Sequence, residues 1–225
     1  MAQQGGYALA SKGAQHDEAW LIFMEMVHKQ LPTFEAKAEA LHYFPMWRTW
    51  FSLHGLCKLP WNDIIPESNK TAKEPAKVPE HVENYLWLYE GVLGKKVTID
   101  DIILESEKVY NFQRLFNLRL GFGTREHDYP PYRAMGPVLK EEYLDRESFY
   151  DNQVQDDLGM EPAGMTTEQK MTALRAYREH RYEKLVDAVY KRRGWTPNGV
   201  PTLETIKRLG IDYPDVVELA ARHQA

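Results

Sequence analysis

A single thiol stands out among the residues that could do chemistry. Cys57 is the only cysteine of the chain, and it lies in the aromatic-rich stretch 47–61, two residues after Gly55. A free cysteine is most often a small buried side chain. The alternative is a thiolate ligand of an iron–sulfur cluster, with Gly55 letting the backbone approach the cofactor closely. Because such a cluster needs thiolates from several positions, its other ligands would come from another stretch of polypeptide.

Two histidines are further candidates. His16 precedes Asp17 and Glu18, whose charges favour the N-terminal end of a helix, so a helix start explains this segment. Imidazole titrates near neutral pH, and His16 is therefore also a candidate proton donor or hydrogen-bond donor facing a site. His54 lies three residues before Cys57 and can share a helical face with it. We expect His54 to pack beside the site rather than to bind metal.

Several arginines could bind anionic groups such as phosphate, although each is more often a solvated or ion-paired surface residue. They are Arg114, Arg119, Arg125 and Arg133. His127 and Asp128 form another polar pair, for which we expect a structural role. The chain has no Walker, GxGxxG, HExxH, CxxC or GxSxG pattern, so none of these signatures assigns a function.

Helices must position these residues, because apolar side chains recur at helical spacing along most of the chain. Pro45 is expected to break or kink a helix that starts near Thr33, before a continuation to about His54. Residues 1–15 show no helical or strand period. The expected helices cover residues 17–29, 33–44, 46–54, 81–92, 98–120, 139–152 and 167–192, with a short helix after Thr202 and a last one from Pro214.

Local signals mark several of these helix ends. Thr98 and Asp101 form a capping-box pattern, and Thr166 and Gln169 form another. Gly94 is a good residue to follow the end of a helix. The apolar residues of the helix at 98–120 cover more than one face, so we expect it to be buried on several sides. The proline-containing stretches 60–80 and 124–137 are expected to be irregular.

Composition narrows the class of protein. The chain has 225 residues and a net charge of −5 from mixed signs, without a basic stripe that would recruit nucleic acid. No apolar run approaches the length of a membrane span, and the N-terminal residues lack the pattern of a signal peptide. One cysteine excludes an internal disulfide framework and suits a reducing compartment. We therefore expect a cytoplasmic protein without a nucleic-acid partner.

The order and spacing of several short motifs resemble the C-terminal part of the tungsten-dependent aldehyde:ferredoxin oxidoreductase family. Its Gly-Leu-Cys motif stands here at 55–57, and its Asn-x-x-Arg-x-Phe-Asn-x-Arg-x-Gly run stands at 111–121. The run Tyr-x-x-Arg-Gly-Trp at 190–195 is followed by Asn-Gly-x-Pro-Thr at 198–202. Within the family, the stretches 13–20, 47–50 and 131–137 resemble the catalytic subunit of the tungsten (class II) benzoyl-CoA reductases most closely.

The resemblance implies roles for individual residues. Cys57 is similar to the last of four ligands of a [4Fe-4S] cluster. His16 stands where the family has a histidine near the tungsten. Ser52, Gly55 and Leu56 occupy a pterin-binding motif that begins with aspartate in aldehyde oxidoreductases. Serine at position 52 puts a charged contact to the pterin in doubt and fits a branch with different chemistry.

The resemblance also implies a fold, cofactors and partners. It implies an all-α chain, with 1–60 lining the cofactor site, 61–80 as a linker and 81–225 as a helical C-terminal domain. The complete enzyme would hold a bis-pyranopterin tungsten (or molybdenum) centre and a [4Fe-4S] cluster, fed by an iron–sulfur subunit or ferredoxin. The other three cysteines, the other pterin motif and a β-rich domain would belong to an N-terminal remainder, so this chain would be inactive alone.

Two activities are open under that resemblance. The first is reduction of the aromatic ring of benzoyl-CoA or a related aryl-CoA in anaerobic aromatic degradation, and the second is oxidation of an aldehyde to a carboxylate. A third interpretation is a non-catalytic helical interaction module, in which Cys57 is a core thiol.

Overall fold

The computed structural model describes residues 1–11, 13, 21–58 and 79–224. Within these ranges the chain forms helices and no strands, apart from one isolated bridge between Trp195 and Pro201. The all-α class expected from the sequence is confirmed. Residues 17–20 of the helix expected at 17–29 and most of the linker expected at 61–80 lie outside the described residues. Within 21–29 the structure has a π-helical turn at Phe23–Val27 rather than a full helix. The three-part domain division stays a prediction.

The described chain separates into two compact units. Unit 1 comprises Met1–Tyr129 and Val186–Ala225, and unit 2 comprises Pro130–Leu185. The long helix α9 (Thr167–Arg193) is divided between them after Leu185. Each unit has its own core, so each is considered by itself.

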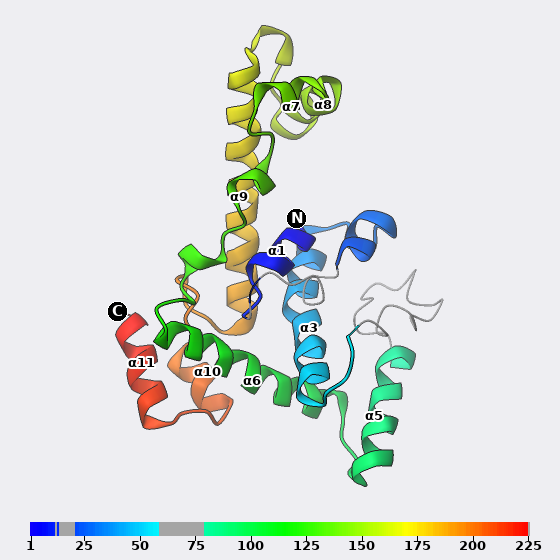
Figure 1. Ribbon diagram of the computed structural model, residues 1–225, viewed down its shortest axis with the longest axis vertical. Helices are drawn as coiled ribbons and strands as arrows, with labels where there is room; N and C mark the ends of the chain where they lie inside the picture. The colour runs from blue at the N-terminus through cyan, green and yellow to red at the C-terminus, as the bar shows by residue number, and fades with distance from the viewer. Residues whose placement is uncertain (12, 14–20, 59–78, 225) are drawn as a thin grey trace. The chain divides into compact units, whose positions relative to one another are not determined.

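Unit 1 is built around two long helices, α3 (Phe34–Leu53) and α6 (Ile99–Arg119), which pack across each other (Figure 1). Helices α10 (Leu203–Arg208) and α11 (Pro214–Gln224) share an apolar core with the second half of α6. Helix α5 (Pro79–Leu93) packs against α3 through aromatic contacts. Shorter elements are α1 (Ala2–Ala8), the π-helical turn η1 (Phe23–Val27) and the 3₁₀ turn η4 (Arg125–Asp128).

Helix α6 begins where the sequence predicts. The Thr98 hydroxyl accepts a hydrogen bond from the Asp101 N–H at 3.1 Å, and the Asp101 carboxylate accepts one from the Thr98 N–H at 2.8 Å. This reciprocal capping satisfies two donors that a helix start leaves open. The expectation that α6 is buried on several sides is wrong, because Phe112 and Phe116 are about half exposed, at 45% and 55%.

Helix α3 continues through Pro45, where the sequence predicts a break or a kink. Proline has no N–H to donate to the carbonyl four residues earlier, which here belongs to Leu41. The buried Arg193 guanidinium donates to that carbonyl instead, with an Nη2···O distance of 3.1 Å. A side chain 152 residues away in sequence therefore satisfies the group that the proline leaves open.

A helix also forms where the sequence shows no period, at α1. The Glu25 carboxylate accepts from the N–H groups of Ala2 and Gln3 at 2.9 and 3.0 Å, and Lys37 lies 3.3 Å from it. A carboxylate at this end of a helix also complements the helix dipole. This stabilisation comes from a residue distant in sequence, which local periodicity does not show.

Unit 2 contains α7 (Lys140–Leu144), α8 (Glu147–Leu158), the 3₁₀ turns η5 (Tyr132–Met135) and η6 (Pro162–Gly164), and the first part of α9. One helix was expected over 139–152, but the structure has two. The core of unit 2 contains Tyr143, whose hydroxyl donates to Asp151 at 2.7 Å. Lys170 pairs with the same carboxylate. The capping box of Thr166 and Gln169 is present at the start of α9.

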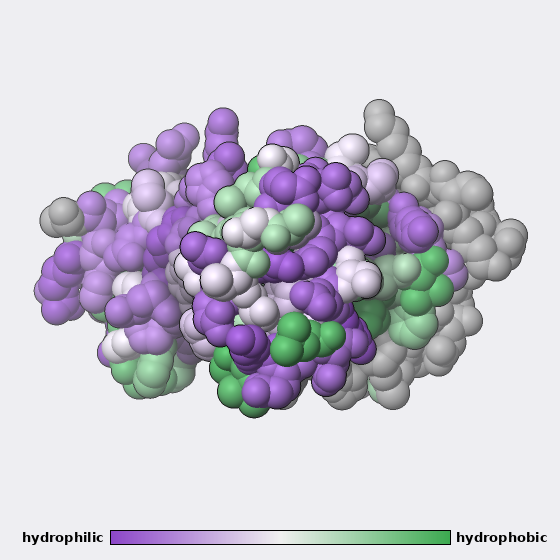
Figure 2. All heavy atoms as spheres, turned by 90° about the horizontal axis from the view of Figure 1, so that it is seen from above, coloured by the Kyte–Doolittle hydropathy of each residue, from purple (hydrophilic) through white to green (hydrophobic). Residues whose placement is uncertain are grey.

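The outer surface is mixed in polarity. On the face that Figure 2 shows, hydrophilic residues predominate and apolar residues gather in small separate groups. Within the described ranges, none of the helices combines the length and the apolar character that a membrane crossing requires.

Candidate metal-ligand site

The Gly-Leu-Cys segment begins with a tight turn that ends α3. Gly55 adopts φ +66°, the Leu56 N–H donates to the Phe51 carbonyl at 2.9 Å, and the Gly55 N–H lies 3.4 Å from the Ser52 carbonyl. These two bonds form a Schellman motif, in which a left-handed residue follows the helix end. A side chain at Gly55 would meet nothing within 4 Å, so glycine is explained by conformation without a close approach.

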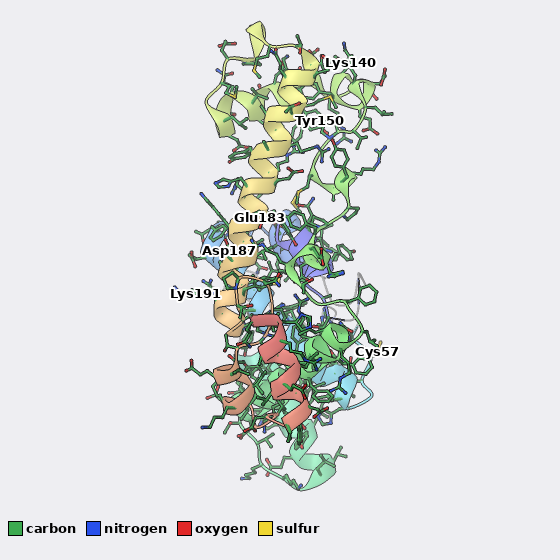
Figure 3. The ribbon with its side chains drawn as sticks, turned by 90° about the vertical axis from the view of Figure 1, so that its left-hand side faces the viewer. Cys57, Lys140, Tyr150, Glu183, Asp187 and Lys191 are labelled. Carbon is green, nitrogen blue, oxygen red and sulfur yellow. The ribbon has the colours of Figure 1, made fainter. Side chains whose placement is uncertain are left out.

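Cys57 emerges directly after this turn with an exposed, free thiol. Figure 3 shows it at the edge of the ribbon. Leu53 and Leu56 beside it are each 41% exposed. The thiol is therefore not a core residue, which was the commoner expectation for a free cysteine. No group of three or more potential metal-ligating side chains occurs in the described part of the chain, so Cys57 is without companion ligands there.

A buried arginine holds the backbone on the far side of Cys57. The Arg48 side chain is completely buried in α3, and its Nη1 donates to the Lys58 carbonyl at 2.7 Å. Its guanidinium also lies over the Phe44 ring, 4.5 Å from the centroid. The Schellman turn and this hydrogen bond fix the chain immediately before and after the thiol. Sequence reasoning missed Arg48; its only signal was a charged residue among the aromatic residues of a buried helix.

The remaining candidates near the turn have local partners. Ser52 is exposed, and its hydroxyl donates to the Arg48 carbonyl at 3.2 Å. His54 packs against the rings of Trp50 and Tyr89, with centroid distances of 4.7 and 5.3 Å. Its Nε2 lies 3.6 Å from a carboxylate oxygen of Glu105. His54 thus packs beside the site, as expected.

His16 lies outside the described residues, but the segment that leads toward it is anchored. The Leu9 carbonyl accepts hydrogen bonds from the Tyr110 hydroxyl at 2.7 Å and from Arg193 Nη1 at 3.3 Å. The Ser11 carbonyl accepts a hydrogen bond from the Asn117 side-chain amide. Residues of α6 and the end of α9 therefore fix the chain up to position 11.

The motif run on α6 has a structural role. Arg114 is buried and forms a bidentate pair with Asp128, at 2.8 and 2.7 Å, and its Nε donates to the Gly199 carbonyl at 2.9 Å. The Tyr190 hydroxyl donates to the same carboxylate. Asn111 accepts from the Trp195 indole N–H at 2.7 Å. These bonds connect the run at 111–121 to the motif at 190–202.

All four arginines considered as anion ligands are found in ion pairs. Besides the buried pair of Arg114, the pairs are Arg119–Asp215 and Arg125–Asp187, both at 2.6 Å, and Arg133–Glu142. The more common alternative, an ion-paired surface residue, therefore holds for Arg119, Arg125 and Arg133, whereas Arg114 is ion-paired but buried.

Comparison with protein families decides what this assembly of motifs is. A family model described as aldehyde ferredoxin oxidoreductase, domains 2 & 3, matches residues 1–211. The chain belongs to this family. Family membership makes it part of an oxidoreductase that uses a tungsten or molybdenum pterin and a [4Fe-4S] cluster. A comparison with curated proteins gives no match.

The residues of this aldehyde ferredoxin oxidoreductase chain fit one corner of a cluster site. An iron–sulfur cluster of this kind takes four thiolates, and the chain has one cysteine. That cysteine is exposed, unbonded, and carried on a backbone fixed from both sides. Since the matched model covers domains 2 and 3, other parts of such an enzyme would have to supply the remaining ligands.

Proposed function

We propose that this chain is the helical portion of an enzyme that reduces the aromatic ring of benzoyl-CoA or a related aryl-CoA, with Cys57 as one ligand of its [4Fe-4S] cluster. The observation that carries the ligand assignment is an exposed thiol held between a Schellman turn and the Arg48 hydrogen bond. The motif stretches at 13–20, 47–50 and 131–137 and the serine at position 52 support the aryl-CoA branch.

When bound, the cluster and the tungsten pterin supply low-potential electrons to the substrate, and this chain's residues do the positioning. Arg48 fixes the Lys58 carbonyl and so limits where the neighbouring thiol can point. Ser52, Gly55 and Leu56 would be the residues of this turn that hold the pterin. The Ser52 hydroxyl, whose hydrogen is donated to the Arg48 carbonyl, would offer an uncharged acceptor oxygen there. His16 donates a proton to the substrate, a role that suits a group titrating near neutral pH.

Oxidation of an aldehyde to a carboxylate is the second candidate, because the matched family is described by that activity. Assays of the purified complete enzyme under anaerobic conditions distinguish aryl-CoA reduction from aldehyde oxidation. Dearomatisation of benzoyl-CoA without oxidation of benzaldehyde supports the first activity. Oxidation of benzaldehyde without turnover of benzoyl-CoA would assign the second.

The ligand assignment is tested separately, by metal content. In the complete enzyme, Cys57→Ser should lower the iron content and abolish the cluster's electron paramagnetic resonance signal, while circular dichroism stays unchanged. Leu53→Ala, at a nearby position that is likewise exposed and has no assigned role, is the matched control and should retain the iron. A Cys57→Ser enzyme with full iron content would refute the assignment.

The role of His16 has its own measurement. His16→Gln removes the titrating group, so turnover should fall and lose its dependence on pH near neutrality, with iron and tungsten contents unchanged. An unchanged pH profile would remove His16 from the mechanism without affecting the assignment of Cys57.

A further inference from the structure

An open pocket of about 500 Å³ lies within unit 2, and the proposed function gives no chemical role to the residues that line it. It is formed by the stretch 131–137, by the residues around α7, and by Arg178 of α9. Three arginines line it, namely Arg133, Arg146 and Arg178, together with two acids, Glu142 and Asp145. Arginine side chains bind anions through their N–H donors, so a concave site lined by three of them is a candidate anion site.

Arg178 is fixed in the pocket by neutral groups. Its Nη2 donates to the Gln153 side-chain oxygen at 2.6 Å, and its Nη1 lies 3.4 Å from the Met135 carbonyl. Burial lowers the pKa of Arg178, and the nearby Tyr150 and Asp157 only partly oppose this effect. Neither acceptor carries charge, so the guanidinium is held in place without being neutralised by its hydrogen-bond partners.

The motif glycine in this stretch makes room for that guanidinium. A side chain at Gly136 would come within 3.0 Å of Arg178 Nη1, and the residue has φ +144°, which other residues rarely adopt. The stretch 131–137, noted in the sequence for its resemblance to one branch, therefore forms a wall of the pocket and positions its central cation.

The acids of the pocket do not cancel its positive charge. Glu142 pairs with Arg133 and also accepts from the N–H groups of Val138 and Leu139, at 2.8 and 3.2 Å. The Arg133 guanidinium is the largest of the causes that lower the pKa of Glu142 to about 2. In the described part of the chain, no carboxylate lies within 4.0 Å of Arg146 or Arg178. Two cations thus face one remaining acid, Asp145.

We propose that this pocket binds the phosphate group of a small molecule. Guanidinium groups present paired N–H donors that match phosphate oxygens, and a phosphate offers enough acceptors for Arg146 and Arg178 at once. The Tyr150 ring, which is labelled in Figure 3, lies 5.7 Å from the Arg178 guanidinium and adds an apolar wall. The proposal concerns unit 2 alone and is independent of Cys57.

The test is calorimetric titration of the 225-residue chain with pyrophosphate at low ionic strength. Arg146→Ala and Arg178→Lys should each weaken binding by about tenfold, the first by removing a charge and the second by removing the fork geometry. Arg119→Ala is the matched control, because it removes one exposed arginine in unit 1 and should leave affinity unchanged. Circular dichroism checks that every variant is folded.

Several results would overturn the proposal. They are the absence of binding to the wild-type chain, equal weakening by Arg119→Ala, which would show diffuse attraction, and equally tight binding of succinate, which would show a carboxylate site. Retained affinity in both pocket variants would likewise exclude these arginines as ligands.

Discussion

Two regions of unit 1 carry the family's motif residues, and they differ in where their polar groups are satisfied. Around Arg114, the guanidinium, the Asp128 carboxylate and the Tyr190 hydroxyl are buried and bonded to one another. At the end of α3, the backbone is equally well fixed, but the Cys57 thiol is exposed and unbonded. Residues of one motif set therefore divide into those that hold the fold and one that is left available to a partner.

The buried region should show the largest effect on stability. Arg114→Met leaves the Asp128 charge without its guanidinium, and breaking a buried pair on one side destabilises by about 3–5 kcal/mol. Urea unfolding measures the loss. Arg119→Ala breaks an exposed pair with Asp215 and should lose no more than about 1 kcal/mol. Similar losses in the two variants would erase the distinction between buried and exposed motif residues.

Acid should weaken unit 1 through His42, which lies on α3. Burial and the neighbouring Arg193 charge lower the pKa of His42 to about 4, with Arg192 acting in the same direction and Glu39 and Glu107 opposing. Because the unfolded chain binds this proton at a higher pH, the stability contribution is present above about pH 6.5 and is lost as the pH falls toward 4.

The lowered pKa of His42 sets an upper limit on this loss of stability. The loss amounts to at most about 3 kcal/mol, and urea unfolding at several pH values between 7 and 4 would follow it. His42→Gln should flatten the slope over this range. An equally steep slope in that variant would show that other groups cause the acid sensitivity.

Much of the local structure could be predicted because its causes lie close together in sequence. The caps at Thr98 and Thr166 involve partners three residues away, and Gly94 follows the end of α5 as expected. The helix does not break at Pro45, one of the two outcomes expected there, and the cause of its continuity is distant in sequence. Arg193 satisfies the Leu41 carbonyl from 152 residues away, and no pattern around the proline reveals that.

The candidate site shows the same division. The thiol and its turn were visible in the sequence, because Gly55, Leu56 and Cys57 are adjacent. The hydrogen bond from Arg48 to the Lys58 carbonyl could not be predicted from the sequence, because it depends on how the chain returns to the buried helix face after the turn. Exposure of Cys57 likewise depends on packing, and residue type alone favoured a buried thiol.

The turn at the end of α3 should show a moderate effect that arises from the backbone. Gly55→Ala forces a side chain into a left-handed conformation and should destabilise by about 1 kcal/mol. Gly91→Ala is the matched control, since that glycine lies within α5, lacks a positive φ and has equally open space around it. Alanine there should stabilise by about 0.5–1 kcal/mol. If both variants changed the unfolding free energy in the same direction, the Schellman turn would not explain why position 55 is glycine.

The smallest effect on stability should come from the residue with the most chemical consequence. Cys57→Ser changes an exposed, unbonded side chain, so the unfolding free energy of the chain should change by less than about 0.5 kcal/mol. The same substitution should remove iron from the complete enzyme. A stability loss above about 1 kcal/mol would mean that the thiol packs within the chain. A neutral result beside a large loss for Arg114→Met would show that Cys57 is retained for a partner rather than for the fold.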